Sequence, residues 1–466
     1  MTDRIETQSV RTVVADARKR AEPATATVRG ISRLRRRVGI ALREVRAVQR
    51  ERCNPGIALR RVWSAWRVMA PGYAKRFASA WVFMDRDVDA NDSGEVLYRW
   101  IARHRPDVNA WFVLRRDSAD WPRLEREGVR LVAYGSTAFA ALMLSAEHVA
   151  SSHADRFVTD PLPKRYGRRA YNFTFLQHGV IKSDISRWVN SKSIATLVAS
   201  TQDEYDYLTG GSPYRVGSKE VRLTGLPRFD ALLEQDRRVS EADRDLILVM
   251  PTWRDYLVGA MTGSSRERAG AEGFENTAYA RALSQLLASE ELAAAAHQHG
   301  ARIVLMPHPN MHMFLDRFEL PSHVEVRSYD DVDVREMIAR ARVLLTDYSS
   351  IAFNMAYVQR PVVYYQFDRE EFLAGHTERP GYFEYDTHGF GPVVEHAAGA
   401  VDAIVDALTG EVDPVYLARM QATFPVRDGQ NSRRVFDAMV ESRRLRSQAE
   451  RRTAAPLDTW ESVAGA

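Results

Sequence analysis

The sequence predicts an α/β protein built from two successive parallel sheets. From Trp81 onward, short apolar runs typical of strands alternate with segments of helical periodicity, a pattern that favours parallel sheets. A charge-rich stretch at residues 234–244 interrupts this alternation, and the apolar run at 245–250 starts it again. With 466 residues, of which 45% are hydrophobic, the chain is long enough to bury at least two cores.

We therefore divide the chain into five parts. Residues 1–28 are polar and rich in Ala and Thr, and we expect them to be disordered. Residues 29–70 are expected to form a basic helical arm, residues 71–240 the first α/β domain and residues 241–440 the second. Residues 441–466 are expected to be a polar tail, and no internal repeat is visible beyond the two α/β halves.

The predicted arm at residues 29–70 is strongly basic. Between Arg29 and Arg67 there are twelve Arg and two acids, which leaves a net charge of +10 (twelve Arg less two Glu). Apolar residues recur at helical spacing with Arg on the other faces, and a second short helix carries Trp63 and Trp66. Such helices suit an anionic membrane surface, where each cation adds about 1 kcal/mol.

Two other interpretations of the arm stay open. It could be a solvated helix docked on the body of the protein, or it could bind nucleic acid. We do not expect nucleic acid as a partner, because the aromatic residues lie in a separate helix and no nucleic-acid motif accompanies the arginines.

The location of the protein is expected from its cysteine count and its apolar runs. The lone Cys53 excludes an internal disulfide. The sequence has no apolar run of about 18 residues that would predict a membrane span, and no apolar segment typical of a signal peptide. We therefore expect a peripheral protein on the cytoplasmic face of the cell membrane.

The most distinctive stretch is residues 342–356, Arg-Val-Leu-Leu-Thr-Asp-Tyr-Ser-Ser-Ile-Ala-Phe-Asn-Met-Ala. It predicts a strand at 343–345, a turn made by Thr346, Asp347 and Tyr348, and a helix at about 351–358 capped by Ser349 and Ser350. The free N–H groups and dipole of a helix start attract phosphate, and serine hydroxyls add donors. Two ordinary capping serines of an α/β unit are the alternative explanation.

Three further segments accompany this one in the order 175–180 (Phe-Leu-Gln-His-Gly-Val), 223–230 with 248–254, and 304–309 (Val-Leu-Met-Pro-His-Pro). Together they resemble the CDP-glycerol glycerophosphotransferase family, the teichoic acid primases and polymerases. The likeness continues through 360–368, 378–386 and 391–394 and covers roughly residues 81–426. It implies a GT-B fold with two Rossmann-type domains facing a cleft. The implied reaction moves a polyol phosphate from a CDP-activated donor to a membrane-anchored acceptor.

The resemblance and the strand positions together select two candidate catalytic residues, His178 and His308. Each follows a predicted strand, and ligands of such folds bind beyond the carboxyl ends of the strands. Neutral imidazole can take the proton of an acceptor hydroxyl, and a protonated imidazole or Arg can stabilise the leaving CMP. We assign His178 as the base and His308 as a donor-phosphate contact or acid; structural turn histidines are the alternative.

The remaining candidates are expected to bind the donor and its phosphates. Guanidinium groups pair bidentately with phosphate, although ordinary salt bridges could explain the same arginines. The set consists of Arg228, Thr252, Arg254, Thr346, Asp347, Ser349, Ser350 and Arg379. Asn354 departs from the family, which usually has Asp after this Phe.

No metal site or cofactor is expected. His308 and His312 have the spacing of a helical metal site, but Pro309 and Asn310 break the helix that this spacing requires. The Gly-rich dinucleotide fingerprint and the P-loop are both absent, and Asp330, Asp331 and Asp333 are expected to cap a helix at 334–341.

The expected substrates are CDP-glycerol or CDP-ribitol and a lipid-linked or polymeric polyol-phosphate acceptor of the teichoic acid or capsular kind. Two alternatives remain open. One is a GT-B glycosyltransferase that uses a nucleotide sugar, and the other is a catalytically silent, membrane-associated scaffold.

Overall fold

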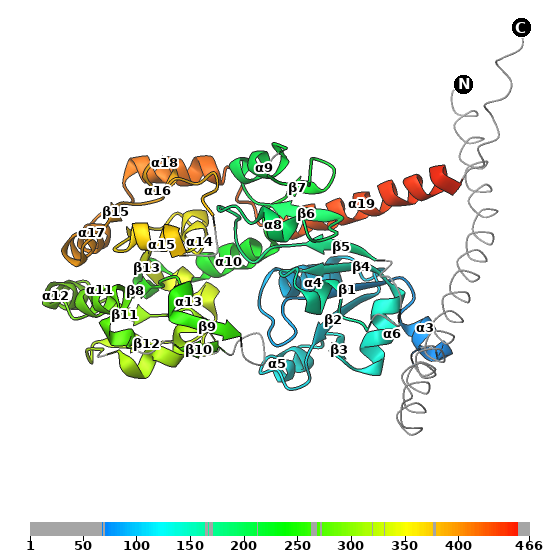
Figure 1. Cartoon of the computed structure of the whole chain (residues 1–466), viewed down its shortest axis with the longest axis horizontal. Coiled ribbons are helices and arrows are strands. Elements are labelled where there is room, and N and C mark those ends of the chain that lie inside the picture. Colours follow the sequence, from blue (N-terminus) through cyan, green and yellow to red (C-terminus); the bar gives the residue numbers. More distant parts are fainter. Residues whose placement is uncertain are drawn as a thin grey trace, which may run out of the picture.

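The computed structural model describes residues 68, 70–163, 166, 171–211, 213–261, 268–270, 273–318, 320–329, 331–375 and 379–454. They form two lobes, each with a parallel sheet between helices (Figure 1). The predicted α/β, GT-B-like fold with two Rossmann-type halves is therefore confirmed. The segment expected to be disordered (1–28) and almost all of the basic arm (29–70) lie outside the described residues.

The first lobe has a seven-stranded parallel sheet in the order β3-β2-β1-β4-β5-β6-β7. Its central strands are buried along their whole length, which explains why they appear in the sequence as continuous apolar runs. The strands are β1 Ala80–Met84, β2 Ala110–Leu114, β3 Leu131–Ala133, β4 Ala146–Ser151, β5 Asn172–Phe175, β6 Thr196–Ala199 and β7 Val221–Leu223.

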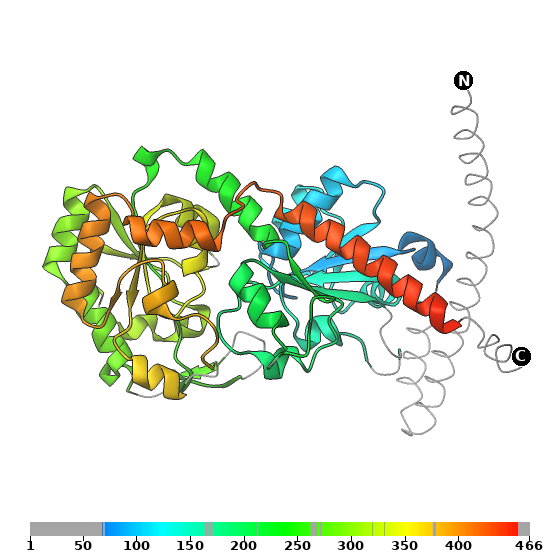
Figure 2. The same ribbon diagram turned by 90° about the horizontal axis from the view of Figure 1, so that it is seen from above.

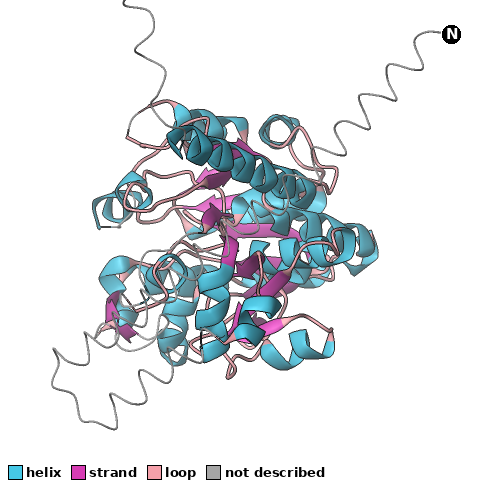
Figure 3. Ribbon diagram, turned by 90° about the vertical axis from the view of Figure 1, so that its right-hand side faces the viewer, coloured by secondary structure: helices cyan, strands magenta, loops and turns pink. Residues whose placement is uncertain are grey.

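Helices cover both faces of this sheet (Figure 3). Alternate residues of β1 belong to two separate apolar clusters, Trp81 and Phe83 with α4 on one face and Val82 and Met84 with α6 on the other. The helices are α3 Pro71–Arg76, α4 Ser93–His104, α5 Trp121–Arg126, α6 Thr137–Ser145, α7 Arg156–Thr159, α8 Ser186–Val189 and α9 Gln202–Thr209.

The second lobe has a six-stranded parallel sheet in the order β12-β11-β8-β13-β14-β15. Its strands are β8 Leu246–Val249, β11 Arg302–Leu305, β12 Val324–Val326, β13 Ala341–Thr346, β14 Val362–Tyr365 and β15 Val393–Val394. Its helices are η2 Glu241–Asp243, η3 Asp255–Leu257, η4 Phe274–Asn276, α11 Ala278–Leu287, α12 Glu290–Gln298, η5 Pro309–Arg317, α13 Val334–Arg340, α14 Ala352–Tyr357, α15 Arg369–Gly375, α16 Tyr385–His388 and α17 Ala397–Thr409. Between η3 and η4 this lobe has a short antiparallel pair, β9 Val258–Met261 with β10 Arg268–Gly270.

Two connections join the lobes. The helix α10 (Pro227–Arg238) leads from the first sheet to the second, and its apolar side belongs to one core cluster that continues through both lobes. After α18 (Pro414–Thr423), the long helix α19 (Asn431–Ala454) returns to the first lobe and packs on α4, β5 and β6 (Figure 2). Residues 431–440, which the sequence places in the second domain, thus pack on the first lobe, and the predicted polar tail is helical as far as Ala454.

Candidate active site

Two of the segments singled out in the sequence meet between the lobes. The 177–181 loop follows β5 of the first lobe, and the 346–350 turn follows from the end of β13 in the second. A β-carbon placed on Gly179 would lie 2.7 Å from the hydroxyl oxygen of Ser350. The carboxyl end of one sheet therefore contacts the carboxyl end of the other, where ligands of such folds bind.

A buried carboxylate holds the 177–181 loop in place. Glu204 of α9 is fully buried and accepts hydrogen bonds from the backbone N–H groups of Ser200 at 2.6 Å and Ile181 at 2.8 Å. It also accepts one at 3.1 Å from the side chain of Gln177, whose backbone has a positive φ of 63°. Burial raises the pKa of Glu204 to about 7, against the lowering effect of these N–H donors. His178 projects from this anchored loop and is exposed.

Arg228 and His153 lie next to His178. The Arg228 guanidinium donates to the carbonyl oxygen of His178 and lies 3.3 Å from the Asp92 carboxylate. The ring of His153 stacks on that of His178, with 4.9 Å between centroids and 15° between planes. Arg228 therefore belongs to the surroundings of His178 in the first lobe, whereas the sequence places it among the donor-binding residues.

The 346–350 turn is fixed from below by buried polar contacts. Thr346 donates its hydroxyl to the carbonyl of Met250 at 2.7 Å, and both Thr346 and Asp347 are buried. Oδ1 of Asp347 accepts from the backbone of Thr252 at 2.8 Å and of Tyr348 at 2.6 Å. This burial does not favour direct contact of Thr346 or Asp347 with a phosphate, and their hydrogen bonds hold the turn in place.

Ser349 and Ser350 are half-buried at the start of α14. The Ser349 hydroxyl accepts from the N–H of Ile351 at 3.3 Å, but the N-cap residue is Ile351, one position later than predicted, and it has no capping side chain. With six residues, α14 has a weak dipole. The case for phosphate binding therefore depends on the two hydroxyls more than on the helix.

Arg254 is not placed to contact a phosphate. It is 1% exposed, and its Nε and Nη2 donate to both oxygens of Asp368 at 2.7 and 2.9 Å. Its Nη1 lies 2.9 Å from Asp347 and donates to the carbonyl of Thr252 at 2.7 Å. Because the guanidinium is already paired with two buried carboxylates, this geometry does not favour the direct phosphate contact predicted from the sequence.

Thr252 and His308 lie at the ends of β8 and β11 in the same lobe. The hydroxyl of Thr252 is buried and has no hydrogen-bond partner among the described residues. His308 precedes η5, and its Nδ1 accepts from the N–H of Asn310 at 3.2 Å. An accepting Nδ1 leaves the proton on Nε2, which can therefore donate a hydrogen bond.

Arg379 lies where the second lobe crosses onto the first. Its side chain is exposed, and its carbonyl accepts from the N–H of Asp184 at 2.9 Å in an isolated antiparallel bridge. Two residues later, a β-carbon on Gly381 would collide with the carbonyl of Lys182. Asn354 is 3% exposed within α14, where the carboxylate usual in the family would be a buried charge.

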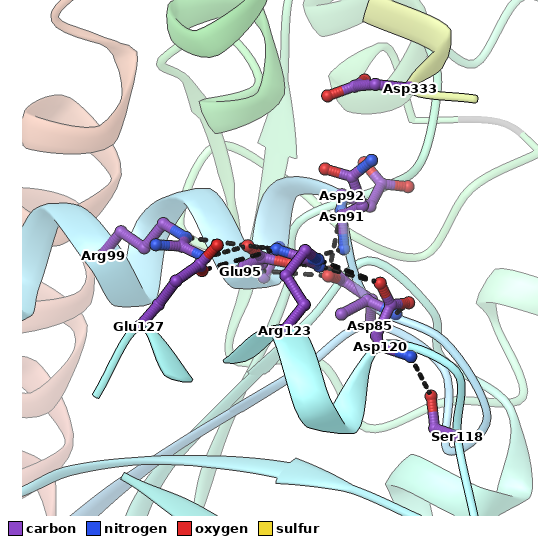
Figure 4. Close-up of polar contacts among 12 residues, drawn as sticks. Asp85, Asn91, Asp92, Glu95, Arg99, Ser118, Asp120, Arg123, Glu127 and Asp333 are labelled. Atoms are coloured by element: carbon purple, nitrogen blue, oxygen red, sulfur yellow. Dashed lines mark hydrogen bonds and ion pairs between the residues drawn. The ribbon is translucent and has the colours of Figure 1, made fainter. Parts of the chain in front are cut away.

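In the first lobe, a carboxylate occupies the turn between the strand β1 and the helix α4 (Figure 4). Asp85, at the end of β1, accepts from the N–H groups of Gly94 at 2.7 Å, Asp92 at 3.1 Å and Glu95 at 3.1 Å. Burial and then the charge of Asp92 raise the pKa of Asp85 to about 7. Dinucleotide-binding folds hold phosphate at this helix start. Here the carboxylate of Asp85 occupies that place, which agrees with the absence of the Gly-rich fingerprint from the sequence.

Further charges fix the turn after β1. Glu95 pairs with Arg99 and Arg123; burial alone would raise its pKa, but these two arginines outweigh burial and the pKa is lowered. Asn91 lies at the end of this turn that faces Asp333 (Figure 4), and its side chain is hydrogen-bonded to Arg335 of the second lobe. Asp333 caps α13 by accepting from the backbone of Arg335 at 2.9 Å, as predicted.

Three supporting residues could not be selected from the sequence: Glu204, Asp368 and His153. Each contacts residues far away along the chain, and the sequence assigned none of the three a role, although Asp368 lies in the segment 360–368 that carries the family likeness. In the part of the chain that the structure describes, no group of three or more His, Cys, Asp or Glu could hold a metal ion. No helix of the described residues is long and apolar enough to cross a membrane.

Comparisons with known proteins find a family model and relatives that match most of the chain. The family model of CDP-glycerol:poly(glycerophosphate) glycerophosphotransferase matches residues 73–441. The minor teichoic acid biosynthesis protein GgaB of Bacillus subtilis (strain 168) is 30% identical over 369 residues, which are 78% of this chain and 39% of GgaB. A teichoic acid glycerol-phosphate transferase of Staphylococcus aureus (strain NCTC 8325 / PS 47) is 27% identical over 56% of this chain and 70% of its own length.

The fold is also similar to solved structures. The wall teichoic acid polymerase TagF superposes with a TM-score of 0.61 at 15% identity, covering 88% of this chain and 99% of that chain. This likeness supports the two-lobed fold alone, while the family model extends over most of the sequence. This chain spans well under half the length of GgaB. It belongs to the CDP-glycerol:poly(glycerophosphate) glycerophosphotransferase family.

Proposed function

We propose that this chain transfers glycerol phosphate or ribitol phosphate from its CDP ester to a hydroxyl of a polyol-phosphate acceptor, releasing CMP. The observation that carries the proposal is the contact between Gly179, beside His178, and Ser350. It brings the segment that carries His178 in one lobe next to the hydroxyl of Ser350 in the other. Relatives named as glycerol-phosphate and ribitol-phosphate enzymes, and the structures of TagF solved with CDPG, support the choice of donor.

In this mechanism, His178 removes the proton from the acceptor hydroxyl. The oxygen attacks the phosphorus that carries the polyol, a new O–P bond forms, and the bond from that phosphorus to the bridging oxygen of CMP breaks. His308, through Nε2–H, and the hydroxyls of Ser349 and Ser350 donate to the phosphate oxygens on which negative charge develops. The exposed Arg379 and the hydroxyl of Thr252, which has no hydrogen-bond partner among the described residues, also donate hydrogen bonds to the phosphates of the CDP-polyol.

Four further residues support this chemistry without contacting the donor. Arg254, Thr346 and Asp347 hold the 346–350 turn, and Arg228 ties the segment of His178 to Asp92. No metal ion is assigned a step, since hydroxyls, imidazole and guanidinium provide the donors in this proposal.

A panel of donors tests the function. Purified full-length protein is incubated with a polyol-phosphate acceptor and CDP-glycerol, CDP-ribitol, UDP-sugars or GDP-sugars, and the released nucleotide is identified. Release of CMP from a CDP-polyol is expected. Release of UDP or GDP would show a nucleotide-sugar glycosyltransferase, and no release with any donor would favour a silent scaffold.

We further propose that residues 29–70 hold the enzyme on the anionic cytoplasmic face of the membrane, near a lipid-linked acceptor. The net charge of +10 between Arg29 and Arg67 (twelve Arg less two Glu), beside an apolar stripe, supports this assignment. Removing residues 1–70 should release the protein from anionic vesicles, and added salt should weaken binding of the full chain. Equal sedimentation of both forms would assign the arm a structural role.

A further inference from the structure

A second histidine lies directly against the proposed base. His153 follows β4 and His178 follows β5, and these strands are paired neighbours in the first sheet. At their carboxyl ends the two imidazole rings are stacked, with 4.9 Å between centroids and 15° between planes. None of the sequence motifs included His153, and the reaction proposed above assigns it no step.

His153 is the fixed member of this pair. Its backbone N–H donates to the hydroxyl of Ser151 at 3.1 Å, and that hydroxyl donates to the carbonyl of Asp85 at 3.0 Å. The next residue, Ser152, donates its hydroxyl to the buried carboxylate of Asp85. The His153 side chain is 12% exposed, whereas His178 is an exposed residue. One ring is therefore set into the sheet edge, and the other lies on it.

A general base has to point one ring nitrogen at the hydroxyl it deprotonates, within hydrogen-bond distance. An exposed imidazole samples several ring orientations, and only some are productive. Stacking on an immobile ring restricts rotation about the last side-chain bond while the ring edge, with its nitrogens, stays accessible. Errors of about 1 Å in such positioning can cost up to about 10²-fold in rate.

The charges around His153 suit this task. Burial, then the nearby His178, Arg86 and Arg228, lower the pKa of His153 well below its usual value. The ring is therefore neutral near pH 7 and adds no positive charge under the base. The carboxylate of Asp155 lies 4.0 Å from Nδ1, and the ring of Phe157 packs 6.3 Å away between centroids.

We propose that His153 is a positioning residue, which stacks on His178 and holds its imidazole in the orientation that accepts the proton of the acceptor hydroxyl. This inference rests on the proposed function, in which His178 is the base. It predicts that a flat ring at position 153 is sufficient, and that the chemistry of imidazole is not needed there.

The test compares His153→Phe, which keeps a ring, with His153→Ala and His153→Leu, which remove it; Leu retains apolar bulk if the Ala variant does not fold. Turnover and KM for CDP-glycerol are measured with each. We expect Ala and Leu to lower kcat roughly 10- to 100-fold with little change in KM, and Phe to stay near the wild type. His104→Ala is the matched control, because His104 stacks on Trp100 in the same lobe, at 4.8 Å between centroids, but lies exposed on α4.

The same substitutions in a His178→Ala background decide whether His153 acts through His178. We expect no further loss there, since the ring has no base left to position. An equal loss in Phe and Ala, a loss that adds to that of His178→Ala, or a rise in KM at unchanged kcat would each overturn the proposal.

A second readout does not depend on turnover. In protein labelled at histidine ring carbons, NMR relaxation reports the motion of the His178 ring. We expect higher mobility in His153→Ala and wild-type rigidity in His153→Phe. Unchanged mobility in the Ala variant would overturn the positioning role even if no CDP-polyol is a substrate, so the two proposals can fail separately.

Discussion

Replacing Asp368 with Asn is expected to destabilise the second lobe and to loosen the turn that carries Ser349 and Ser350. Asp368 is 3% exposed and binds Arg254 through both carboxylate oxygens, at 2.7 and 2.9 Å. It also accepts from the hydroxyl of Tyr348 at 3.2 Å. Asn keeps the shape and one acceptor, but it removes the charge and presents an amide donor to a group that has only donors.

The cost follows from the burial of the pair. Breaking a buried ion pair by removing one partner typically costs about 3–5 kcal/mol, because the other charge stays buried without compensation. Here Arg254 retains Asp347 at 2.9 Å, so we expect the lower end of that range, about 3 kcal/mol. Donor affinity should fall as well, since Tyr348 and Asp347 belong to the 346–350 turn.

Urea unfolding measures the loss, and amide hydrogen exchange in β8 and β13 reports the second lobe directly if the lobes unfold separately. Asp386→Asn is the matched control. Its partner Arg369 lies 3.2 Å away, but the two side chains are 62% and 36% exposed, so a change below about 1 kcal/mol is expected. A loss below about 1 kcal/mol for Asp368→Asn, or equal losses in both variants, would refute the reasoning.

Three further predictions concern the site. Replacing both Ser349 and Ser350 with Ala should weaken CDP binding in calorimetry and cost at most about 1–2 kcal/mol of stability; unchanged affinity would contradict their role. His178→Ala should lower turnover roughly 10²–10⁴-fold with donor affinity retained, whereas His308→Ala should lower both turnover and donor affinity. If His178→Ala lost donor affinity as much as His308→Ala does, the assignment of different roles to the two histidines would be disproved. Because burial raises the folded pKa of Glu204 from 4.5 to about 7, its contribution to stability is fully present below about pH 4.5 and is lost as the pH rises through about 7. The unfolding temperature should therefore fall across that range, and Glu204→Gln should flatten the fall; an identical slope in the variant would contradict the assignment.

The fold was predictable because its strands are buried on both faces. A strand of that kind is a short continuous apolar run, such as Leu246–Val249, and the sequence places the restart of the α/β pattern within one residue of it. The position of His178 followed from the same logic, since a residue after a parallel strand lies at the ligand-binding edge. The contact of Gly179 with Ser350 could not be predicted in this way, because spacing along the chain does not determine how two lobes are oriented.

The role of Arg254 shows what local sequence leaves out. A single arginine in a strand-end turn has the features of a phosphate ligand, and its partner Asp368 is 114 residues away. Glu204 is similar, because Thr201 and Glu204 have the spacing of a capping box, yet the carboxylate bonds to the 177–181 loop. For Arg254 and Glu204, the sequence shows a charged group that can form hydrogen bonds. Which partner it binds is determined by tertiary packing, and the sequence does not show it.

The two glycines at the junction of the lobes are required because a side chain would not fit there, and not because of their backbone conformation. Neither Gly179 nor Gly381 has a positive φ, so another residue could adopt the same backbone there. A β-carbon at 381 would collide with the carbonyl of Lys182, and one at 179 would crowd the hydroxyl of Ser350. These glycines therefore preserve contact between the lobes and contribute little to the fold of either one. The hydroxyls proposed to bind the donor and the histidine proposed as the base come from different lobes, so the proposed reaction depends on close contact between the lobes.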